Sequence, residues 1–251
     1  MDITLSPEVI ILLPLIAFAA FFVKAISGFG PAIVVVALGS LIIPPQAVIP
    51  VSSLLDATAG AILFAMDPVR GKSRFWVPLG LAITAGSVVG GYFLTLISPD
   101  VFRLLLAVAI ILLGAWFFAG RIRKGSQPLE TEVPDHFTSG DMLACGSGGL
   151  MGGFLGISGP PLLWHFGRRF AKAPLRQILI PVFLVAALAR ASTYAVTGAL
   201  VGSTLLAFAI SLPGLLLGIW AGNRLFVTIS ERTFSRVIGA VIAAVGVRLL
   251  F

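Results

Sequence analysis

Long apolar runs follow one another along this chain, and no other feature constrains its fold as strongly. A helix needs about 20 residues to cross the roughly 30 Å of hydrocarbon in a bilayer. Backbone polar groups in lipid must be satisfied within the spanning segment, as they are in a helix. We therefore expect an all-α polytopic membrane protein. Six runs are long enough to cross outright: 47–66, 75–97, 101–119, 178–199, 203–223 and 233–250.

Few charged residues accompany these runs. Asp, Glu, Lys and Arg make up 11% of the chain, whereas a soluble domain carries about 25%. So few charges cannot cover a water-soluble globule of 251 residues, but they suffice where the surrounding solvent is hydrocarbon. The net charge of +7 forms no basic face interleaved with aromatics. We therefore expect no nucleic-acid partner and interpret the excess as the cytoplasmic bias of Lys and Arg.

The remaining runs form two pairs, 9–43 and 141–167, each with a longer and a shorter arm. The short arms, 31–43 and 161–167, cannot cross alone at about 1.5 Å per residue. We interpret each pair as one re-entrant or broken-helix unit, and the sequence leaves open whether the pairs are re-entrant or fully spanning. The arms are separated by the breaks Ser27-Gly-Phe-Gly-Pro31 and Gly156-Ile-Ser-Gly-Pro-Pro161.

Basic residues gather in four clusters between the apolar runs, and these clusters set the orientation. They hold 13 of the 17 Lys and Arg residues, and the short loops on the opposite side hold none. By the positive-inside rule the clusters lie in the cytoplasm. We therefore expect both termini outside and the 125–140 linker, a plain solvated connector, inside. The clusters lie at Arg70–Arg74, Arg121–Lys124, Arg168–Arg176 and Arg224–Arg236.

The chain also repeats itself. Six residues recur at one fixed offset, from Gly86 and Gly218 (218 − 86 = 132) to Gly114 and Gly246 (246 − 114 = 132). Each half holds one paired unit and three crossings, an odd number that inverts the second half, as in many secondary transporters. The alternative is a duplicated scaffold without transport. The predicted divisions are a first transmembrane repeat (1–124), a cytoplasmic linker (125–140) and a second, inverted transmembrane repeat (141–251).

The two breaks are the strongest candidates for a site. In each, a proline begins the short arm, and Ser or Gly beside it supplies the loop and the cap. Free backbone N–H groups at a helix start carry about half a positive charge and bind anions. Two facing starts, at Pro31 and Pro160, would make an anion site near the membrane midplane; alternatively, Gly and Pro merely kink packed helices. The predicted substrate-binding residues at the breaks are Ser27, Gly28, Gly30, Ser158 and Gly159.

Three ionisable residues lie within or beside apolar runs, where such residues are costly and mark function by default. Arg190 either holds an anionic substrate or is the structural partner of Asp56. Asp56 is the predicted site of a coupling ion, a proton or sodium. Lys24, directly before the first break, either contacts the substrate or snorkels to an interface. Lys24 and Arg190 complete the predicted substrate-binding set.

Other residues point away from catalysis. We interpret His165 as packed or hydrogen-bonded rather than as a proton relay, and Cys145 as a small buried residue. Two His and one Cys at scattered depths do not make a metal set, and the sequence has no phosphate-binding loop. We therefore expect no enzyme, no metal and no other cofactor. The Gly86/Gly90 and Gly218/Gly222 pairs are predicted to be close-packing helix faces.

At the first break with its following apolar run and Pro44, and at Gly153-Phe-Leu-Gly-Ile-Ser-Gly-Pro-Pro161, the sequence resembles a known family. It is the TauE/SafE family of bacterial sulfite and organosulfonate exporters, also called the toluene-sulfonate uptake permease family. The duplicated layout extends the resemblance over essentially the whole chain. In that family the first motif is often richer in glycine, and Phe29 and Pro31 depart from this pattern. The resemblance implies a transporter of small sulfur-containing anions, directed outward, in the bacterial cytoplasmic membrane.

The function expected from these observations is secondary transport of sulfite or an organosulfonate by alternating access. The alternatives are an uptake permease or channel for another small anion, and a membrane-embedded enzyme or scaffold. The sequence leaves open the exact substrate, the direction, the coupling ion and the oligomeric state, a homodimer included.

Overall fold

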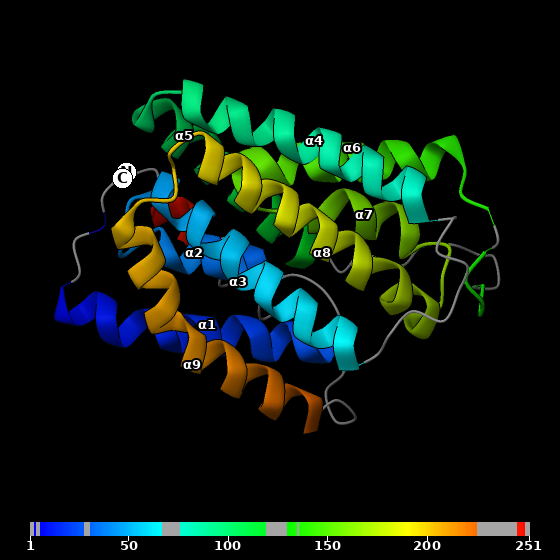
Figure 1. The fold of residues 1–251 in the computed structure, drawn as a ribbon, viewed down its shortest axis with the longest axis horizontal. Coiled ribbons are helices and arrows are strands. Elements are labelled where there is room, and N and C mark those ends of the chain that lie inside the picture. Colours follow the sequence, from blue (N-terminus) through cyan, green and yellow to red (C-terminus); the bar gives the residue numbers. More distant parts are fainter. Residues whose placement is uncertain are drawn as a thin grey trace.

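The computed structural model describes residues 3, 6–27, 31–66, 76–118, 130–134, 136–224 and 245–248. Apart from one isolated bridge, every regular element in these ranges is a helix, so the expected all-α fold is confirmed (Figure 1). The labelled helices are α1 (Pro7–Ser27), α2 (Pro31–Gly39), α3 (Pro45–Met66), α4 (Trp76–Leu96), α5 (Pro99–Phe118), α6 (Ser139–Leu155), α7 (Gly159–Phe166), α8 (Lys172–Val196) and α9 (Gly202–Arg224).

Six of the described helices are long and apolar enough to cross a membrane. Five of them, α3, α4, α5, α8 and α9, coincide with runs expected to cross, while the run 233–250 lies almost wholly outside the described residues. The sixth is α1, expected only as the longer arm of a paired unit. It begins already at Pro7, since proline is favoured at the first helical position. The other paired unit is shorter, with 17 residues in α6 and 8 in α7.

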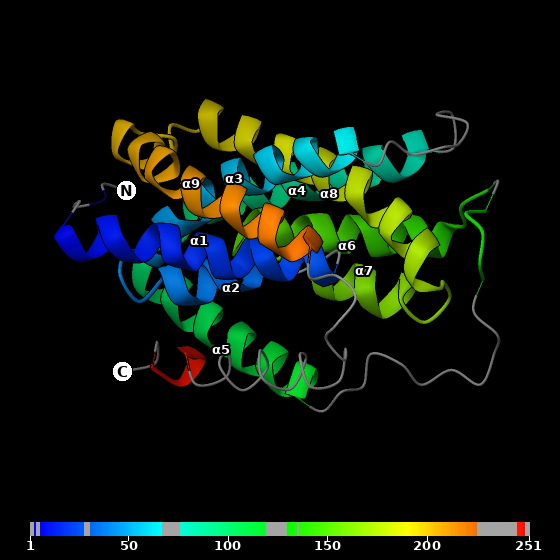
Figure 2. The same cartoon turned by 90° about the horizontal axis from the view of Figure 1, so that it is seen from below.

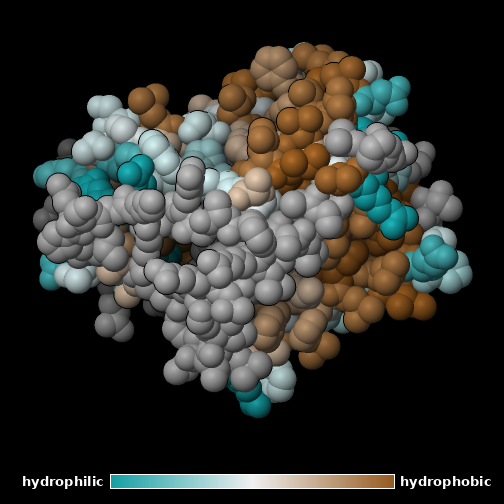
Figure 3. Space-filling model, turned by 180° about the vertical axis from the view of Figure 1, so that it is seen from behind, coloured by the Kyte–Doolittle hydropathy of each residue, from teal (hydrophilic) through white to brown (hydrophobic). Residues whose placement is uncertain are grey.

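The outer faces of these helices are apolar. Leu81, Leu112 and Leu143 expose 66%, 65% and 73% of their surface. Exposure of so many apolar side chains is unfavourable in water but not in hydrocarbon. Figure 3 shows apolar side chains gathered over the middle of the described surface and hydrophilic ones toward the two ends of the long axis. This distribution fits a bundle that crosses the bilayer along its long axis.

Glycines bring helices from distant parts of the chain into backbone contact. An added Cβ at Gly86 or Gly90 of α4 would collide with the backbone of α6. A Cβ at Gly218 or Gly222 of α9 would collide with α1 in the same way. The prediction that these glycines form close-packing faces is therefore confirmed. Their partners come from the other half of the chain, as the adjacent α1 and α9 show (Figure 2).

The two broken units fold back on themselves from opposite ends of the bundle. In both ribbon views α1 runs inward from one end and α2 returns toward it, whereas α6 and α7 do the same from the other end (Figures 1 and 2). The long helices α3 and α8 pack against each other. The starts of α2 and α7 consequently point into the interior of the bundle.

Candidate functional site

A cavity of about 30 Å³ lies where the starts of α2 and α7 meet α3 and α8. Pro31 and Ala32 line it from α2, and Ser158 and Gly159 line it from the start of α7. Both Gly/Pro breaks therefore lead to one cavity. Each helix start contributes partial positive charge from its unpaired backbone N–H groups.

Three charged side chains from three helices meet at the cavity wall. Lys24 Nζ on α1 lies 3.2 Å from Oδ1 of Asp56 on α3, and Arg190 Nη2 on α8 lies 3.1 Å from Oδ2 of the same carboxylate. Arg190 Nη1 also donates a hydrogen bond of 2.8 Å to Ser158 Oγ. Lys24, Asp56 and Arg190 are buried, with exposed fractions of 3%, 7% and 2%. The carboxylate thus bridges two cations that come from different halves of the sequence.

The interpretation of Arg190 as the partner of Asp56 is confirmed, and its role in holding an anionic substrate stays a prediction. The guanidinium pairs with Asp56, and it also lines the cavity. Its Nε is buried and has no hydrogen-bond partner in the described part of the chain, a condition that costs about 1–3 kcal/mol for a buried donor. Lys24 does not snorkel, because its side chain is only 4% exposed and is paired.

The start of α7 differs from the expected geometry. The helix begins at Gly159, one residue before Pro160, and the Ser158 hydroxyl caps no backbone N–H. The hydroxyl accepts instead from Arg190. Gly156, which ends α6, has a positive φ of 77°, a conformation that favours glycine. Among the described glycines only Gly156 and Gly198 have positive φ, so Gly159 carries no such constraint.

Gly152 is a site residue that sequence reasoning missed. An added Cβ there would collide with Ser158 Oγ and lie 2.7 Å from Arg190 Nη1. The hydrogen bond between Ser158 and Arg190 therefore requires that residue 152 have no side chain. The sequence held a signal for this role: Gly148, Gly152 and Gly156 recur every four residues, a spacing that places small residues on one side of α6 and of its C-terminal end.

The first break is described only in part. Gly28 and Gly30 lie outside the described residues. Ser27 is the last residue of α1, and the placement of its side chain is not described. The flanking residues Lys24 and Pro31 both line the cavity.

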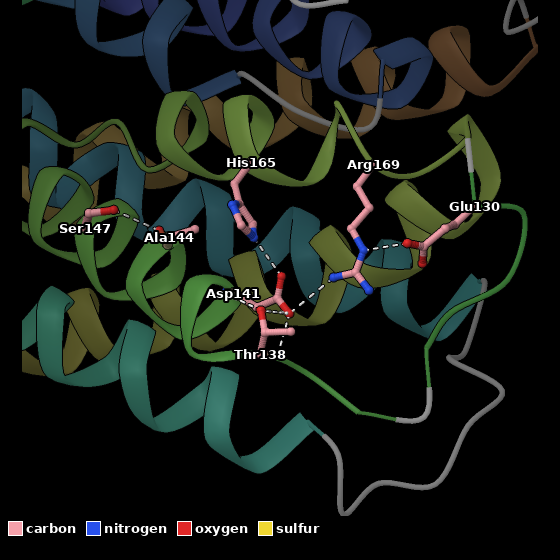
Figure 4. Close-up of polar contacts among 7 residues, drawn as sticks. All are labelled: Glu130, Thr138, Asp141, Ala144, Ser147, His165 and Arg169. Carbon is pink, nitrogen blue, oxygen red and sulfur yellow. Dashed lines mark hydrogen bonds and ion pairs between the residues drawn. The ribbon is translucent and has the colours of Figure 1, made fainter. Parts of the chain in front are cut away.

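A second polar cluster joins the far end of α7 to the start of α6, as Figure 4 shows. Asp141 is fully buried and accepts hydrogen bonds from the backbone N and the Oγ1 of Thr138, at 2.6 and 2.9 Å. Nε2 of His165 lies 2.7 Å from the other carboxylate oxygen, and Arg169 Nη1 lies 3.5 Å from Oδ2. The interpretation of His165 as hydrogen-bonded is confirmed, and the buried Cys145 also matches expectation.

The linker is not the plain solvated connector expected from its composition. Arg169 Nε donates to Glu130 Oε1 at 2.6 Å, and the Glu130 backbone bonds to the backbones of Arg169 and Ala171 at 2.9 and 2.8 Å. Val133 and Phe137 pack, partly buried, against the core. Glu130 thereby docks the described part of the linker on the α7–α8 connection, while Phe137 contacts Trp76 of α4.

Replacing Asp141 by asparagine is expected to destabilise the protein. The amide nitrogen cannot accept a hydrogen bond, so at least one donor of the cluster loses its acceptor at the fully buried residue 141. Because the donors are themselves partly exposed, the loss belongs at the lower end of the range for such a group, about 1 kcal/mol. Thermal unfolding in detergent measures the loss as a lower midpoint. Ser147→Ala is the matched control on the same helix, because the exposed Ser147 hydroxyl bonds only its own helix at Ala144 O, 3.1 Å away. Equal midpoints for Asp141→Asn and wild type would contradict the assignment.

The similarity of this chain to known proteins extends over both broken units and the residues that line the cavity. The profile of the family described as Sulfite exporter TauE/SafE matches residues 13–249. A Cupriavidus necator protein described as a probable sulfite/organosulfonate exporter TauE is 27% identical over 249 residues, 96% of this chain and 95% of that protein. No solved structure matches the chain significantly. With six crossing-length apolar helices among its described residues and a match over nearly all of its length, this multi-pass bacterial inner-membrane transport protein belongs to the TauE/SafE sulfite exporter family.

Proposed function

We propose that the chain is a secondary transporter that exports sulfite or an organosulfonate from the cytoplasm. The observation that carries the proposal is the buried cavity at which two broken helices meet two cations, Lys24 and Arg190, and one carboxylate, Asp56. An intramembrane site of this kind suits a small anion. The family and the description of the C. necator relative support the substrate class and the outward direction.

The site offers several kinds of anion ligand. The planar Arg190 guanidinium lines the cavity, and its fork of donors suits two oxygens of a sulfite or sulfonate group. Lys24 supplies a point charge from the opposite side of Asp56. Backbone N–H groups at the starts of α2 and α7 add donors at the same cavity. Ser158 holds Arg190 in place and is itself within reach of the anion.

The burial of the site supports alternating access rather than an open channel. Lys24, Asp56 and Arg190 at the cavity wall expose at most 7% of their surface. We therefore expect the anion to enter when helices around the cavity move apart. The short helices α2 and α7 are the elements that we expect to move, since each begins at the cavity and the two run toward opposite ends of the bundle.

The packing of the helices supports the inverted repeat on which such a mechanism depends. In the inverted repeat, α4 corresponds to α9 and α6 corresponds to α1. The contact between α4 and α6 therefore corresponds to the contact between α9 and α1, and both contacts are made through glycines. The broken unit α1–α2 likewise corresponds to α6–α7, and the two units enter from opposite ends of the bundle. We propose that the cytoplasmic end is the one where Arg168, Arg169 and Arg224 lie, next to the docked linker.

A wider pocket of about 610 Å³ lies at the other end of α2. Ser40 and the loop to Pro45 line it together with Arg103 and Arg248. These two arginines belong to neither the cytoplasmic clusters nor the central cavity. The pocket is therefore a suitable exit vestibule for an anion that leaves the cavity along α2.

Flux through reconstituted proteoliposomes tests the proposed function. Purified protein in sulfite-loaded vesicles is expected to release sulfite at least about tenfold faster than protein-free vesicles. Parallel assays with an imposed proton or sodium gradient identify the ion for which Asp56 is the proposed coupling site. Organosulfonates replace sulfite in a second series. If folded protein moves no sulfite and no sulfonate under any gradient, the proposed function is wrong.

A further inference from the structure

The charged residues that line the central cavity restrict which anions it can bind. Among the described residues that line the cavity, three are charged: Lys24, Asp56 and Arg190. They are two cations and one carboxylate, held together by contacts of 3.2 and 3.1 Å. All three are at least nine-tenths buried, so water does not screen them. With all three groups ionised, the cluster carries one net positive charge in the interior.

A buried charge without a counter-ion is strongly unfavourable. A bound ion with one negative charge neutralises the cluster. A doubly charged ion leaves one uncompensated negative charge, and an uncharged ligand leaves the positive charge in place. While Asp56 holds no coupling ion, its single negative charge and the charge of the bound anion together balance the two cations. The carboxylate therefore determines how much charge the ligand brings.

We propose that Asp56 limits the transported ion to a single negative charge. This inference rests on the proposed function and specifies its substrate: singly charged sulfur oxyanions, namely sulfonates and hydrogensulfite, and not sulfate or doubly charged sulfite. For sulfite, the exported species then carries its own proton. Arg190 brings a planar guanidinium to the cavity wall, where its Nη1 donates to Ser158 Oγ.

Two probes of fixed charge isolate this effect. Methanesulfonate carries one negative charge and sulfate carries two throughout the neutral range, and both present oxygens on a tetrahedral sulfur. Binding to purified protein in detergent is measured by calorimetry. The wild type is expected to bind methanesulfonate at least about tenfold more tightly than sulfate, a difference of about 1.4 kcal/mol. Asp56→Asn, with two net positive charges, is expected to reverse the preference in favour of sulfate.

Two further variants complete the comparison. Lys24→Gln leaves the Asp56–Arg190 pair with no net charge, and is expected to weaken binding of both probes by about tenfold or more. The double variant Lys24→Gln, Asp56→Asn again has one net positive charge and is expected to recover the preference for methanesulfonate. This recovery separates a charge effect from damage to the site, and it decides the question even if Asp56→Asn alone does not fold.

The outcomes distinguish the inference from the function on which it rests. Sulfite flux by a wild type that binds sulfate as tightly as methanesulfonate overturns the charge rule and leaves the transporter standing. The charge rule is equally overturned if folded Asp56→Asn keeps the wild-type preference, or if the double variant prefers sulfate. A wild type that binds neither probe and moves no sulfite refutes the proposed function itself.

Discussion

Replacing Arg190 by alanine is expected to lower anion transport about a hundredfold in a protein that still folds. In the proposed function the guanidinium donates to the anion as a charged group, and such hydrogen bonds contribute about 1.5–3 kcal/mol each. A loss of about 2.7 kcal/mol corresponds to about a hundredfold. Asp56 remains paired with Lys24 at 3.2 Å, so the substitution leaves no orphaned carboxylate. Initial rates in proteoliposomes measure the effect, and the unfolding midpoint reports on the fold.

The lysine variant provides the matched control. Arg190→Lys keeps the charge, but one ammonium cannot reproduce the planar fork that donates to Asp56 and Ser158 and, in the proposed function, to the anion. We expect transport to fall about tenfold. If Arg190 is instead only the structural partner of Asp56, Arg190→Ala loses stability and the double alanine variant regains it. Wild-type transport by well-folded Arg190→Ala protein excludes the substrate role.

A single added methyl group at Gly149 is expected to disrupt the bundle. The Cβ of Gly149→Ala would collide with the carbonyl oxygen of Ile83 and lie 2.9 Å from the backbone N of Ser87. Both obstacles are α4 backbone and cannot rotate away, so α4 and α6 must separate. Overpacking typically costs about 1–3 kcal/mol and occasionally more, and this contact belongs at the upper end. The yield of monodisperse protein and its unfolding midpoint should both fall.

Gly202→Ala is the corresponding control, because a Cβ there would meet nothing within 4 Å and the residue has no positive φ. It should match the wild type in yield and midpoint. Equal behaviour of the Gly149 and Gly202 variants would show that α4 and α6 are not packed backbone to backbone.

Several features of the site could be read from the sequence because each is a local property. The short arm at Pro31 begins where the Gly/Pro break predicts it. Asp56 and Arg190 stand out as charges within apolar runs, and the spacing of Gly86 and Gly90 marks a face on which another helix can approach. None of these inferences requires knowledge of a partner.

The partners themselves were beyond sequence reasoning. Gly152 resembles its neighbouring glycines along the chain, and only the approach of Ser158 and Arg190 gives it a separate role. The linker is polar in composition, yet Glu130 finds Arg169 on the α7–α8 connection. The sequence could not separate the two roles weighed for Arg190, because the guanidinium both pairs with Asp56 and lines the cavity.

The sequence by itself determined that the chain forms apolar helices, where two of them break and which small faces allow close packing. These properties depend on run length, on Pro and Gly, and on helical spacing within one segment. Only the tertiary structure decided that α4 packs on α6 and α1 on α9, and that Lys24, Asp56 and Arg190 share one cavity. The physical reason is that in a membrane nearly every helix face is apolar, so hydrophobicity does not rank the possible partners. Their choice depends on the shapes of whole faces and on the burial of a few charges.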